Sequence, residues 1–243
     1  MIKTAIITGG TSGIGLAAAK ILVENNYNCA IIGRSQTKGR KALSELDTDR
    51  VIYISADVSK VSDCDKIVAE TVKKFGRVDV LINSAGLYSE GAIDSVDEVE
   101  FDKIFDVNVK GTFFMCKSAI KYLSESRGSI VNIASDAGIK GNYFCSLYSA
   151  SKGAIVAFTK SLALELANIP VRVNCVAPGD VLTPMTEAQI KSSGESIDDL
   201  ASVYPMRRIA TAEEVAESIY FLASDKASFI TGTILSVDGG LTA

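Results

Sequence analysis

Tyr148 and Lys152 stand four residues apart in the segment YSASK, inside the longer run SLYSASKGAIVAFTK. In a helix, positions i and i+4 lie one above the other, so this spacing would bring a phenol and an ammonium group into the same space. A lone pair of this kind is most often a surface tyrosine beside a solvated lysine. It becomes a candidate for proton transfer only if other segments bring a nucleotide or a substrate to it.

A glycine-rich segment, TGGTSGIG (8–15), follows the apolar run TAIIT and leads into helical sequence. Gly9, Gly13 and Gly15 would let the backbone turn tightly and approach a pyrophosphate, whose charge the free N–H groups at a helix N-terminus favour. Three glycines at the first strand-to-helix junction favour nucleotide binding over a plain turn. Their spacing, G-x-x-x-G-x-G, differs from the G-x-G-x-x-G of most dinucleotide folds.

The composition excludes several kinds of chemistry. The chain has no histidine, so Ser-His-Asp machinery, histidine-ligated metals and histidine acid/base catalysis are absent. Five widely spaced cysteines without a CxxC pair are typical of reduced thiols that pack in the core. We therefore expect no metal site, and proton transfer must use other groups.

The charges are evenly mixed. Lys and Arg number 25 against 29 Asp and Glu, so 25 − 29 gives a net charge of −4, and neither sign forms a long run. This pattern argues against a nucleic-acid or membrane partner. The N-terminus resembles neither a secretion signal nor a membrane span, and no apolar stretch reaches about 18 residues. We expect a cytoplasmic protein.

Short β-branched runs alternate with helical segments along the chain. Near-continuous apolar runs suit strands that are covered on both faces, and strand-helix alternation favours a parallel sheet. The sequence thus predicts an α/β fold, a single-domain doubly wound parallel sheet with helices on both faces. The seven expected strands are 4–8, 29–32, 51–55, 78–83, 129–134, 171–177 and 233–237.

Two helices and one irregular segment can also be placed. Residues 61–75 have a 3.6-residue apolar period, and Thr211 with Glu214 forms a capping box that opens a helix through Leu222. The stretch 178–210 breaks the rhythm with prolines, glycines and polar residues, which is typical of a lid. We expect one catalytic domain, 1–243, with 178–210 as its substrate loop.

These motifs occur with NSAG (83–86), Ser135, PGDVLTPM (178–185) and VDGG (237–240). Together they resemble the short-chain dehydrogenase/reductase family over nearly the whole chain. The resemblance implies a Rossmann-like dinucleotide-binding fold and an NAD(P)(H)-dependent oxidoreductase that interconverts a carbonyl and a secondary alcohol. It also implies a catalytic tetrad, which here consists of Asn108, Ser135, Tyr148 and Lys152.

Each tetrad member has an expected role. Tyr148 would exchange a proton with the substrate oxygen, and a nearby ammonium and a cationic nicotinamide would lower its pKa. Ser135 would hydrogen-bond the same substrate oxygen. The resemblance implies that Lys152 also holds the nicotinamide ribose, and that Asn108 holds a water molecule linked to Lys152.

The resemblance extends to the cofactor site. Asp57 would bind the adenine amino group, although a plain helix cap is nearly as common, and Thr183 would bind the nicotinamide carboxamide. The cofactor-binding residues expected from the glycine loop and the resemblance are Gly9, Thr11, Ser12, Gly13, Ile14, Gly15, Arg34, Ser35, Asp57, Val58, Asn83, Ala85, Gly86, Tyr148, Lys152, Pro178, Gly179, Val181 and Thr183.

The end of the second strand indicates which cofactor is preferred. A fold that favours NAD usually places an acid there to bind the ribose 2′-hydroxyl. Here the strand runs into Gly33, Arg34 and Ser35, and an arginine can bind a 2′-phosphate through a charge-assisted fork. We expect NADP(H) to be preferred, with NAD(H) possible.

The substrate stays open between free steroids, sugars or ketones and a 3-oxoacyl-[acyl-carrier-protein]. Reductases of the second kind commonly present two basic residues, and the corresponding positions here are Ser129 and Ile169, with Arg127 and Arg172 nearby. A rival from another class is a non-catalytic nucleotide-binding regulator. The substrate-facing residues are expected to be Tyr88, Tyr143, Phe144 and Cys145 with the 184–210 segment. The family resemblance and the small residues after Tyr148 predict a homotetramer.

Overall fold

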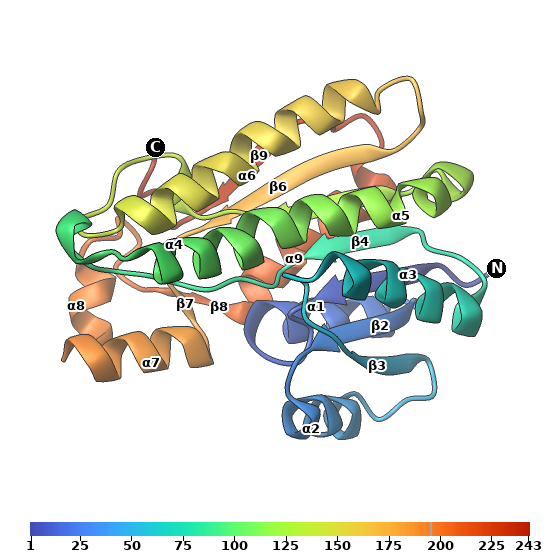
Figure 1. Ribbon diagram of the computed structural model, residues 1–243, viewed down its shortest axis with the longest axis horizontal. Helices are drawn as coiled ribbons and strands as arrows, with labels where there is room; N and C mark the ends of the chain where they lie inside the picture. Colours follow the sequence, from blue (N-terminus) through green and yellow to red (C-terminus); the bar gives the residue numbers. More distant parts are fainter. Residues whose placement is uncertain (195) are drawn as a thin grey trace.

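A parallel sheet forms the centre of the molecule in the computed structural model, which describes residues 1–194 and 196–243, without the side chains of 192 and 193 (Figure 1). All neighbouring strands are parallel, in the order β3-β2-β1-β4-β5-β6-β9. The expected seven-stranded, doubly wound sheet is thereby confirmed. The strands are β1 (Thr4–Thr8), β2 (Asn28–Gly33), β3 (Val51–Ser55), β4 (Val80–Asn83), β5 (Ser129–Ile133), β6 (Arg172–Pro178) and β9 (Ile234–Val237).

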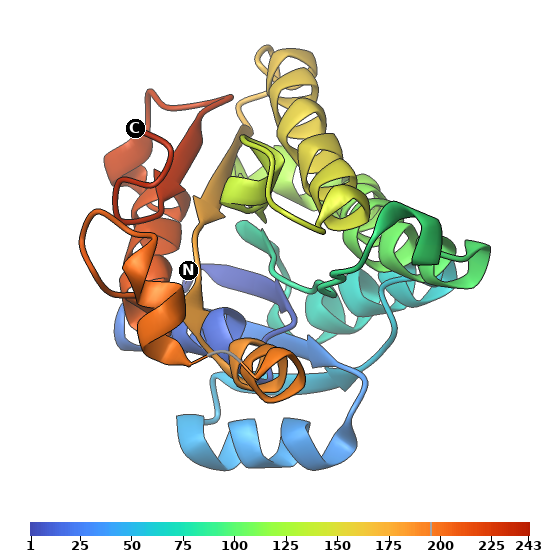
Figure 2. The ribbon, with the colours of Figure 1, turned by 90° about the vertical axis from the view of Figure 1, so that its left-hand side faces the viewer.

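Helices cover both faces of this sheet, as Figure 2 shows. One apolar core joins the sheet to α1 (Gly13–Glu24), α2 (Gln36–Leu46) and α9 (Ala212–Ala223). A second core joins its other face to α3 (Val61–Phe75), α5 (Thr112–Ser126) and α6 (Ser146–Glu165). Burial on both faces explains why the strands read as continuous apolar runs. All five cysteines are buried free thiols, as expected.

The helix that carries Asn108 is not regular. α4 (Glu98–Phe105) continues into a π-helical turn, η2 (Asp106–Gly111), and then into α5. Such turns insert one extra residue and are frequent at functional sites. Asn108 lies in this turn and is 1% exposed, so the turn places a polar side chain in the interior.

The segment expected to be an irregular substrate loop is in fact largely folded. It contains β7 (Val181–Leu182), α7 (Pro184–Ser193), α8 (Ile197–Ser202) and β8 (Ala210–Thr211), and β7 pairs with β8 in a small parallel sheet. Pro184 begins α7 because a proline at the first helical position loses no hydrogen bond. Figure 1 shows α7 and α8 at the same end of the molecule as the start of α6.

The other predicted helices are confirmed. α3 has the bounds expected from its periodicity, and Thr211 and Glu214 form the capping box that opens α9. Short 3-10 turns are η1 (Ile93–Ser95), η3 (Asp136–Gly138) and η4 (Asp225–Ala227). Among the residues described, no helix combines the length and apolarity that a membrane crossing requires.

Candidate active site

The glycine loop joins β1 to α1 with backbone that only glycine adopts easily. Gly9 and Gly13 have φ of +68° and +53°, and a Cβ on Gly9 would lie 2.9 Å from the backbone of Ser84 and Ala85. Gly15 is also needed, because its Cβ would collide with the Gly9 carbonyl. The loop therefore packs directly against the end of β4 and leaves the N-terminus of α1 open.

A cavity of about 700 Å³ lies over this N-terminus. Ser12, the N-cap of α1, makes no side-chain cap bond, so the first N–H groups of the helix are not claimed by that hydroxyl. Free N–H groups beside exposed basic side chains suit a dinucleotide phosphate. The predicted cofactor residues that line the cavity are Gly9, Thr11, Ser12, Gly13, Ile14, Arg34, Ser35, Asp57, Val58, Ala85, Gly86 and Thr183.

At the end of β2, Arg34 and Lys38 are exposed at the cavity. Ser35 caps α2, since its Oγ accepts a hydrogen bond from the Lys38 N–H at 3.3 Å. Asp57 is the acid among the described residues that line the cavity. The cavity wall beside Arg34 is thus basic.

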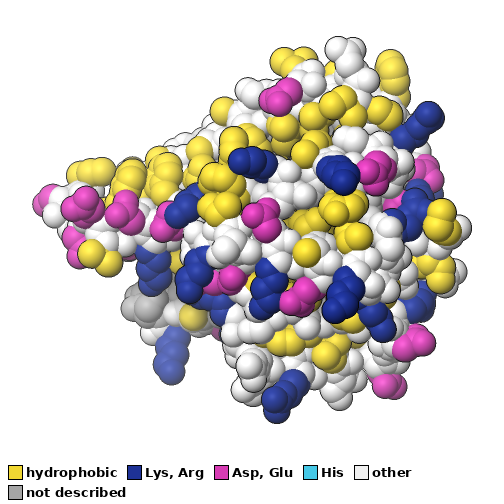
Figure 3. Space-filling view, turned by 45° about the vertical axis from the view of Figure 1, so that its right-hand side comes forward, with side chains coloured by type: hydrophobic (Ala, Val, Ile, Leu, Met, Phe, Trp, Pro, Cys, Tyr) yellow, Lys and Arg dark blue, Asp and Glu magenta, His cyan; other side chains and the backbone are white. Residues whose placement is uncertain are grey.

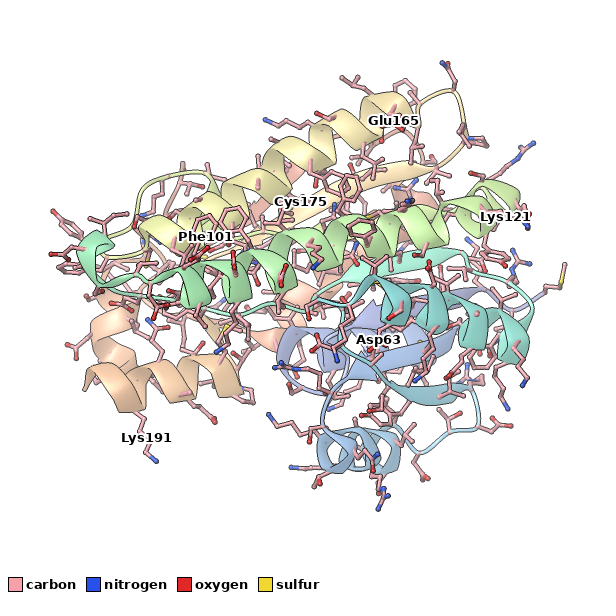
Figure 4. The ribbon with its side chains drawn as sticks, viewed as in Figure 1. Asp63, Phe101, Lys121, Glu165, Cys175 and Lys191 are labelled. Atoms are coloured by element: carbon pink, nitrogen blue, oxygen red, sulfur yellow. The ribbon has the colours of Figure 1, made fainter. Side chains whose placement is uncertain are left out.

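Asp57 is tied into a local turn. Its Oδ1 accepts hydrogen bonds from the Ser59 N–H and Oγ, at 3.1 and 2.8 Å. Its own N–H donates to Asp63, which Figure 4 labels on α3. Asp57 is not the helix cap that the sequence left open, because the N-cap of α3 is Lys60. Its cavity-lining position leaves the adenine role in place as a prediction.

Tyr148 and Lys152 lie on one face of α6, as their spacing predicts. The Lys152 Nζ is 5.6 Å from the centroid of the Tyr148 ring and donates a hydrogen bond to the Ile133 carbonyl at 2.9 Å. Lys152 is 6% exposed. Lys152 is thus buried and Tyr148 half-buried, so the interpretation as a solvated surface pair is excluded.

Burial shifts both groups toward their neutral forms. It lowers the pKa of Lys152 to about 8. Burial also raises the pKa of Tyr148, which a hydrogen bond with Ser135 opposes and the charges of Asp136 and Asp180 reinforce. Desolvation thus dominates among the protein's own groups, and the lowering of the Tyr148 pKa by Lys152 together with a bound nicotinamide stays a prediction.

Ser135 and Asn108 complete the cluster. Ser135 caps η3, where its Oγ accepts from the Ala137 N–H at 3.2 Å. The Asn108 amide bonds both backbone groups of Leu87, at 2.8 and 2.9 Å, and donates to the Ser151 Oγ at 3.0 Å. Asn108 therefore ties the segment after β4 to the helix that carries Tyr148. Its role in holding a water molecule stays a prediction.

Known proteins share this architecture and these motifs. A family model described as enoyl-(acyl carrier protein) reductase matches residues 9–242. The 3-oxoacyl-[acyl-carrier-protein] reductase FabG of Chlamydia muridarum is 35% identical in an alignment that covers 98% of this chain and 97% of that protein. The chain belongs to the short-chain dehydrogenase/reductase family. It is an NAD(P)-dependent oxidoreductase.

Other members of the family are equally similar. Glucose and ribitol dehydrogenase homolog 2 of Arabidopsis thaliana is 38% identical, with 98% of this chain and 85% of that protein covered. A solved structure, "ElxO with NADP Bound", has a TM-score of 0.93 at 36% identity and 99% coverage of both chains. Aldohexose dehydrogenase of Thermoplasma acidophilum has a TM-score of 0.90 at 34% identity, with 99% of this chain and 94% of that chain covered.

A second cavity, of about 450 Å³, adjoins the first in this short-chain dehydrogenase/reductase. Ile14, Ser84, Gly86, Leu87, Thr183 and Met185 line both cavities. The second cavity also holds Ser135, Tyr148 and Lys152, together with the predicted residues Pro178, Gly179 and Val181. The two cavities are thus continuous.

Two predicted cofactor residues lie outside both linings within the described part of the chain, Gly15 and Asn83. Gly15 packs against the Gly9 carbonyl and so supports the glycine loop without lining the cavity. The Asn83 amide donates into the core, to Asn132 at 2.9 Å and Cys116 at 3.3 Å, so a contact between Asn83 and the cofactor stays a prediction.

The predicted substrate-facing residues divide in the same way. Tyr88 and Tyr143 line the second cavity, whereas Phe144 and Cys145 are outside its described lining. Cys145 is buried beneath Tyr88, whose hydroxyl lies 3.4 Å from its Sγ. Lining residues that the sequence did not name individually are Ser84, Leu87, Val107, Asp136, Lys140, Asn142, Asp180, Thr186, Gln189, Tyr204 and Leu241. Four of them, Asp180, Thr186, Gln189 and Tyr204, lie in the segment 178–210 that was expected to form the substrate loop. The sequence could have indicated two of these lining residues, because Asp136 follows Ser135 and Asp180 lies in the motif PGDVLTPM.

Proposed function

We propose that the protein interconverts a carbonyl and a secondary alcohol, with Tyr148 as the acid/base and NADP(H) as the preferred cofactor. The observation that carries this proposal is the position of Ser135, Tyr148 and Lys152 in a cavity continuous with the phosphate-binding one. When bound, the nicotinamide supplies or accepts the hydride. The chain's own residues bind it and handle the proton.

Tyr148 gives its proton to the carbonyl oxygen in reduction and takes one from the hydroxyl in oxidation. Ser135 hydrogen-bonds the same oxygen and keeps it within reach of the phenol. Lys152 is placed to hold the ribose through its ammonium, and its charge stabilises the phenolate that remains after proton donation.

The preference for NADP(H) rests on the basic wall beside the cavity. Arg34 and Lys38 are exposed there, and their charges suit a 2′-phosphate. We expect a higher kcat/KM with NADPH than with NADH, and Arg34→Ala should lower the NADPH value by about tenfold or more, since a charged hydrogen bond is worth ~1.5–3 kcal/mol.

The matched control is Arg40→Ala, because Arg40 is exposed on α2, the helix that follows Arg34, but lies outside the described cavity lining. It should leave both cofactors unaffected. Equal losses with NADPH and NADH in Arg34→Ala, or a wild type that favours NADH, would show that Arg34 does not bind the 2′-phosphate.

A free small molecule is favoured over a carrier-bound acyl chain. Ser129 is buried, and Ile169 is apolar. Arg172 is committed elsewhere: its guanidinium donates to the carbonyls of Leu222, Ala223 and Ser224 at 2.7 to 3.3 Å. The basic pair expected of a carrier-protein reductase is thus missing at these positions.

A substrate panel tests the reaction. NADPH absorbance is followed with ketones, steroids, sugars and 3-oxoacyl thioesters, and turnover with a free carbonyl supports the proposal. Cofactor binding without turnover across the panel, together with an unchanged result for Tyr148→Phe, would favour the regulator. Efficient turnover of carrier-bound thioesters alone would favour the 3-oxoacyl reductase.

A homotetramer is proposed from two unpartnered surfaces. Val99, Phe101, Phe113 and Leu164 are 45–80% exposed on α4, α5 and α6, and Figure 3 shows hydrophobic groups among mixed charges on this side. β9 pairs only with β6 in the described chain, so its other edge is open. Two such surfaces can build paired two-fold interfaces. A stable 25.7 kDa particle in light scattering at micromolar concentration would contradict this.

A cytoplasmic location is proposed from the thiols. All five cysteines are buried and unpaired, which fits a reducing compartment. Fractionation of cells that produce the protein tests this location, and recovery from an oxidising compartment would contradict it.

A further inference from the structure

Asp136 is a buried carboxylate that contacts the catalytic serine. The Ser135 Oγ donates a hydrogen bond to its Oδ1 at 2.7 Å, and the Asn142 side chain donates to its Oδ2 at 3.2 Å. Asp136 is 6% exposed. None of the ion pairs formed by the described residues includes it. Its charge is therefore held by neutral donors, one of which belongs to the catalytic tetrad.

The hydrogen bonds of Ser135 decide what this hydroxyl offers to Tyr148. A serine hydroxyl has one proton and two lone pairs. The proton goes to Asp136, and the Ala137 N–H takes one lone pair at 3.2 Å. In the protein without substrate, Ser135 has no second proton to donate to Tyr148, so the hydrogen bond that would lower the Tyr148 pKa competes with the bond to Asp136.

The charge of Asp136 acts in the same direction. A carboxylate near a phenol opposes formation of the phenolate. Groups that face Tyr148 come from several elements, and the described cations that line its cavity are Lys152 and Lys140. The titratable and charged groups are Asp136 on η3, Asp180 after β6, Cys145 and Lys152 at α6, and Tyr88 after β4, whose ring centroid lies 5.0 Å away.

We propose that Asp136 is a positioning residue that acts through Ser135 and through its own charge to hold Tyr148 as a proton donor at neutral pH. This inference rests on the proposed acid/base role of Tyr148. In reduction the carbonyl carbon receives the hydride of the reduced cofactor, and the proton of the Tyr148 hydroxyl moves to the carbonyl oxygen. The phenolate then regains a proton from solvent. Asp136 transfers nothing in this step.

The test is a direct titration of Tyr148 in the full chain without added nucleotide. Tyrosines labelled with ¹³C at Cζ are followed by NMR against pH, and Tyr148→Phe identifies the signal. Asp136→Asn keeps an oxygen that accepts from Ser135 but removes the charge. We expect the Tyr148 midpoint to fall by about half a unit or more in Asp136→Asn.

The control is Asp225→Asn, which removes an exposed carboxylate paired with Lys3, outside the lining of the site. It should leave the midpoint unchanged. Asp136→Ser provides a second uncharged variant if Asp136→Asn folds poorly. A second readout is the rising limb of kcat/KM for alcohol oxidation, which should move to lower pH by a similar amount.

An unchanged or raised Tyr148 midpoint in the uncharged variants would overturn the proposal. If Tyr148 stays protonated up to the highest usable pH, the kinetic readout decides, and a rising limb of kcat/KM that does not move would overturn the proposal. The NMR titration needs neither cofactor nor substrate. If the protein reduced no carbonyl, the proposed function would be refuted. The titration would still measure the effect of Asp136 on the pKa of Tyr148.

Discussion

Lys152 should lower the stability of the protein at neutral pH. Its ammonium is buried and bonded to one carbonyl, and burial lowers its pKa from 10.5 to about 8. The unfolded chain therefore binds this proton more strongly than the folded one, and stability rises as pH increases from about 8 to 10.5. A difference of 10.5 − 8, or about 2.5 units, corresponds to a cost of about 3 kcal/mol that is fully present below pH 8.

Replacement by methionine should remove this cost. Lys152→Met has an apolar side chain of similar length, but it leaves the Ile133 carbonyl without its donor, a loss of about 1 kcal/mol. We expect a net gain of about 2 kcal/mol in the free energy of unfolding near pH 7. Near pH 10 most of the gain should vanish, because the wild-type lysine is then largely neutral. Turnover should be lost, so the buried charge trades stability for function.

The assay is urea unfolding of both proteins near pH 7 and near pH 10, at one protein concentration because association stabilises the folded state. Near pH 7 the melting temperature should rise by roughly 4–8 °C, since 1 kcal/mol shifts it by about 2–4 °C at this chain length. Lys160→Met is the control, because Lys160 is exposed on the same helix. A variant that is less stable than wild type near pH 7, or equally stabilised at both pH values, would refute the reasoning.

Three further predictions concern single residues. Tyr148→Phe should lower kcat by at least about 10² while the cofactor Kd stays nearly unchanged, because it removes the proton donor and little volume; stopped-flow kinetics and a fluorescence titration measure the two, and retention of a tenth of the rate would contradict the role. Gly15→Ala should weaken cofactor binding and lower stability by about 1–3 kcal/mol, since its Cβ would meet the Gly9 carbonyl; unchanged calorimetric binding would count against this. Arg172→Ala should cost about 2–3 kcal/mol of stability through its lost carbonyl contacts but leave kcat/KM for a free carbonyl within about twofold; a selective loss with a carrier-bound substrate would instead support a docking role.

The sequence predicts the sheet well because each strand is short, apolar and followed by an amphipathic helix. Three of the seven strand starts and both named helix starts agree with the structure to the residue, for example at Thr4 and Val61. The segment 178–210 was predicted less well. Pro184 suggests a break, but at the first position of α7 it favours a helix. Local residue types do not show which of these two positions a proline will occupy.

Residue types in the sequence predict which side chains gather at the site, but not where each side chain points. Asn83 stands in a motif that resembles the family's, yet the strand directs its amide into the core toward Asn132. The sequence predicts that Lys152 and a bound nicotinamide lower the Tyr148 pKa, but it does not reveal the opposing effect of burial, which raises this pKa in the structure. Position along the chain shows which residues are neighbours, whereas burial and rotamer decide which contacts these residues make and how their pKa values shift.

One backbone contact explains how the separate parts of the tetrad keep their geometry. A Cβ on Gly138 would lie 2.8 Å from the Lys152 carbonyl carbon and oxygen, so η3 rests directly on the backbone of α6. Ser135 and Asp136 lie at the start of η3, and Tyr148 lies one turn before Lys152. Backbone contact is stiffer than side-chain packing, because side chains can change rotamer. The acid/base and its hydrogen-bond partner are therefore positioned by the close approach of two main chains, which only a residue without a side chain permits.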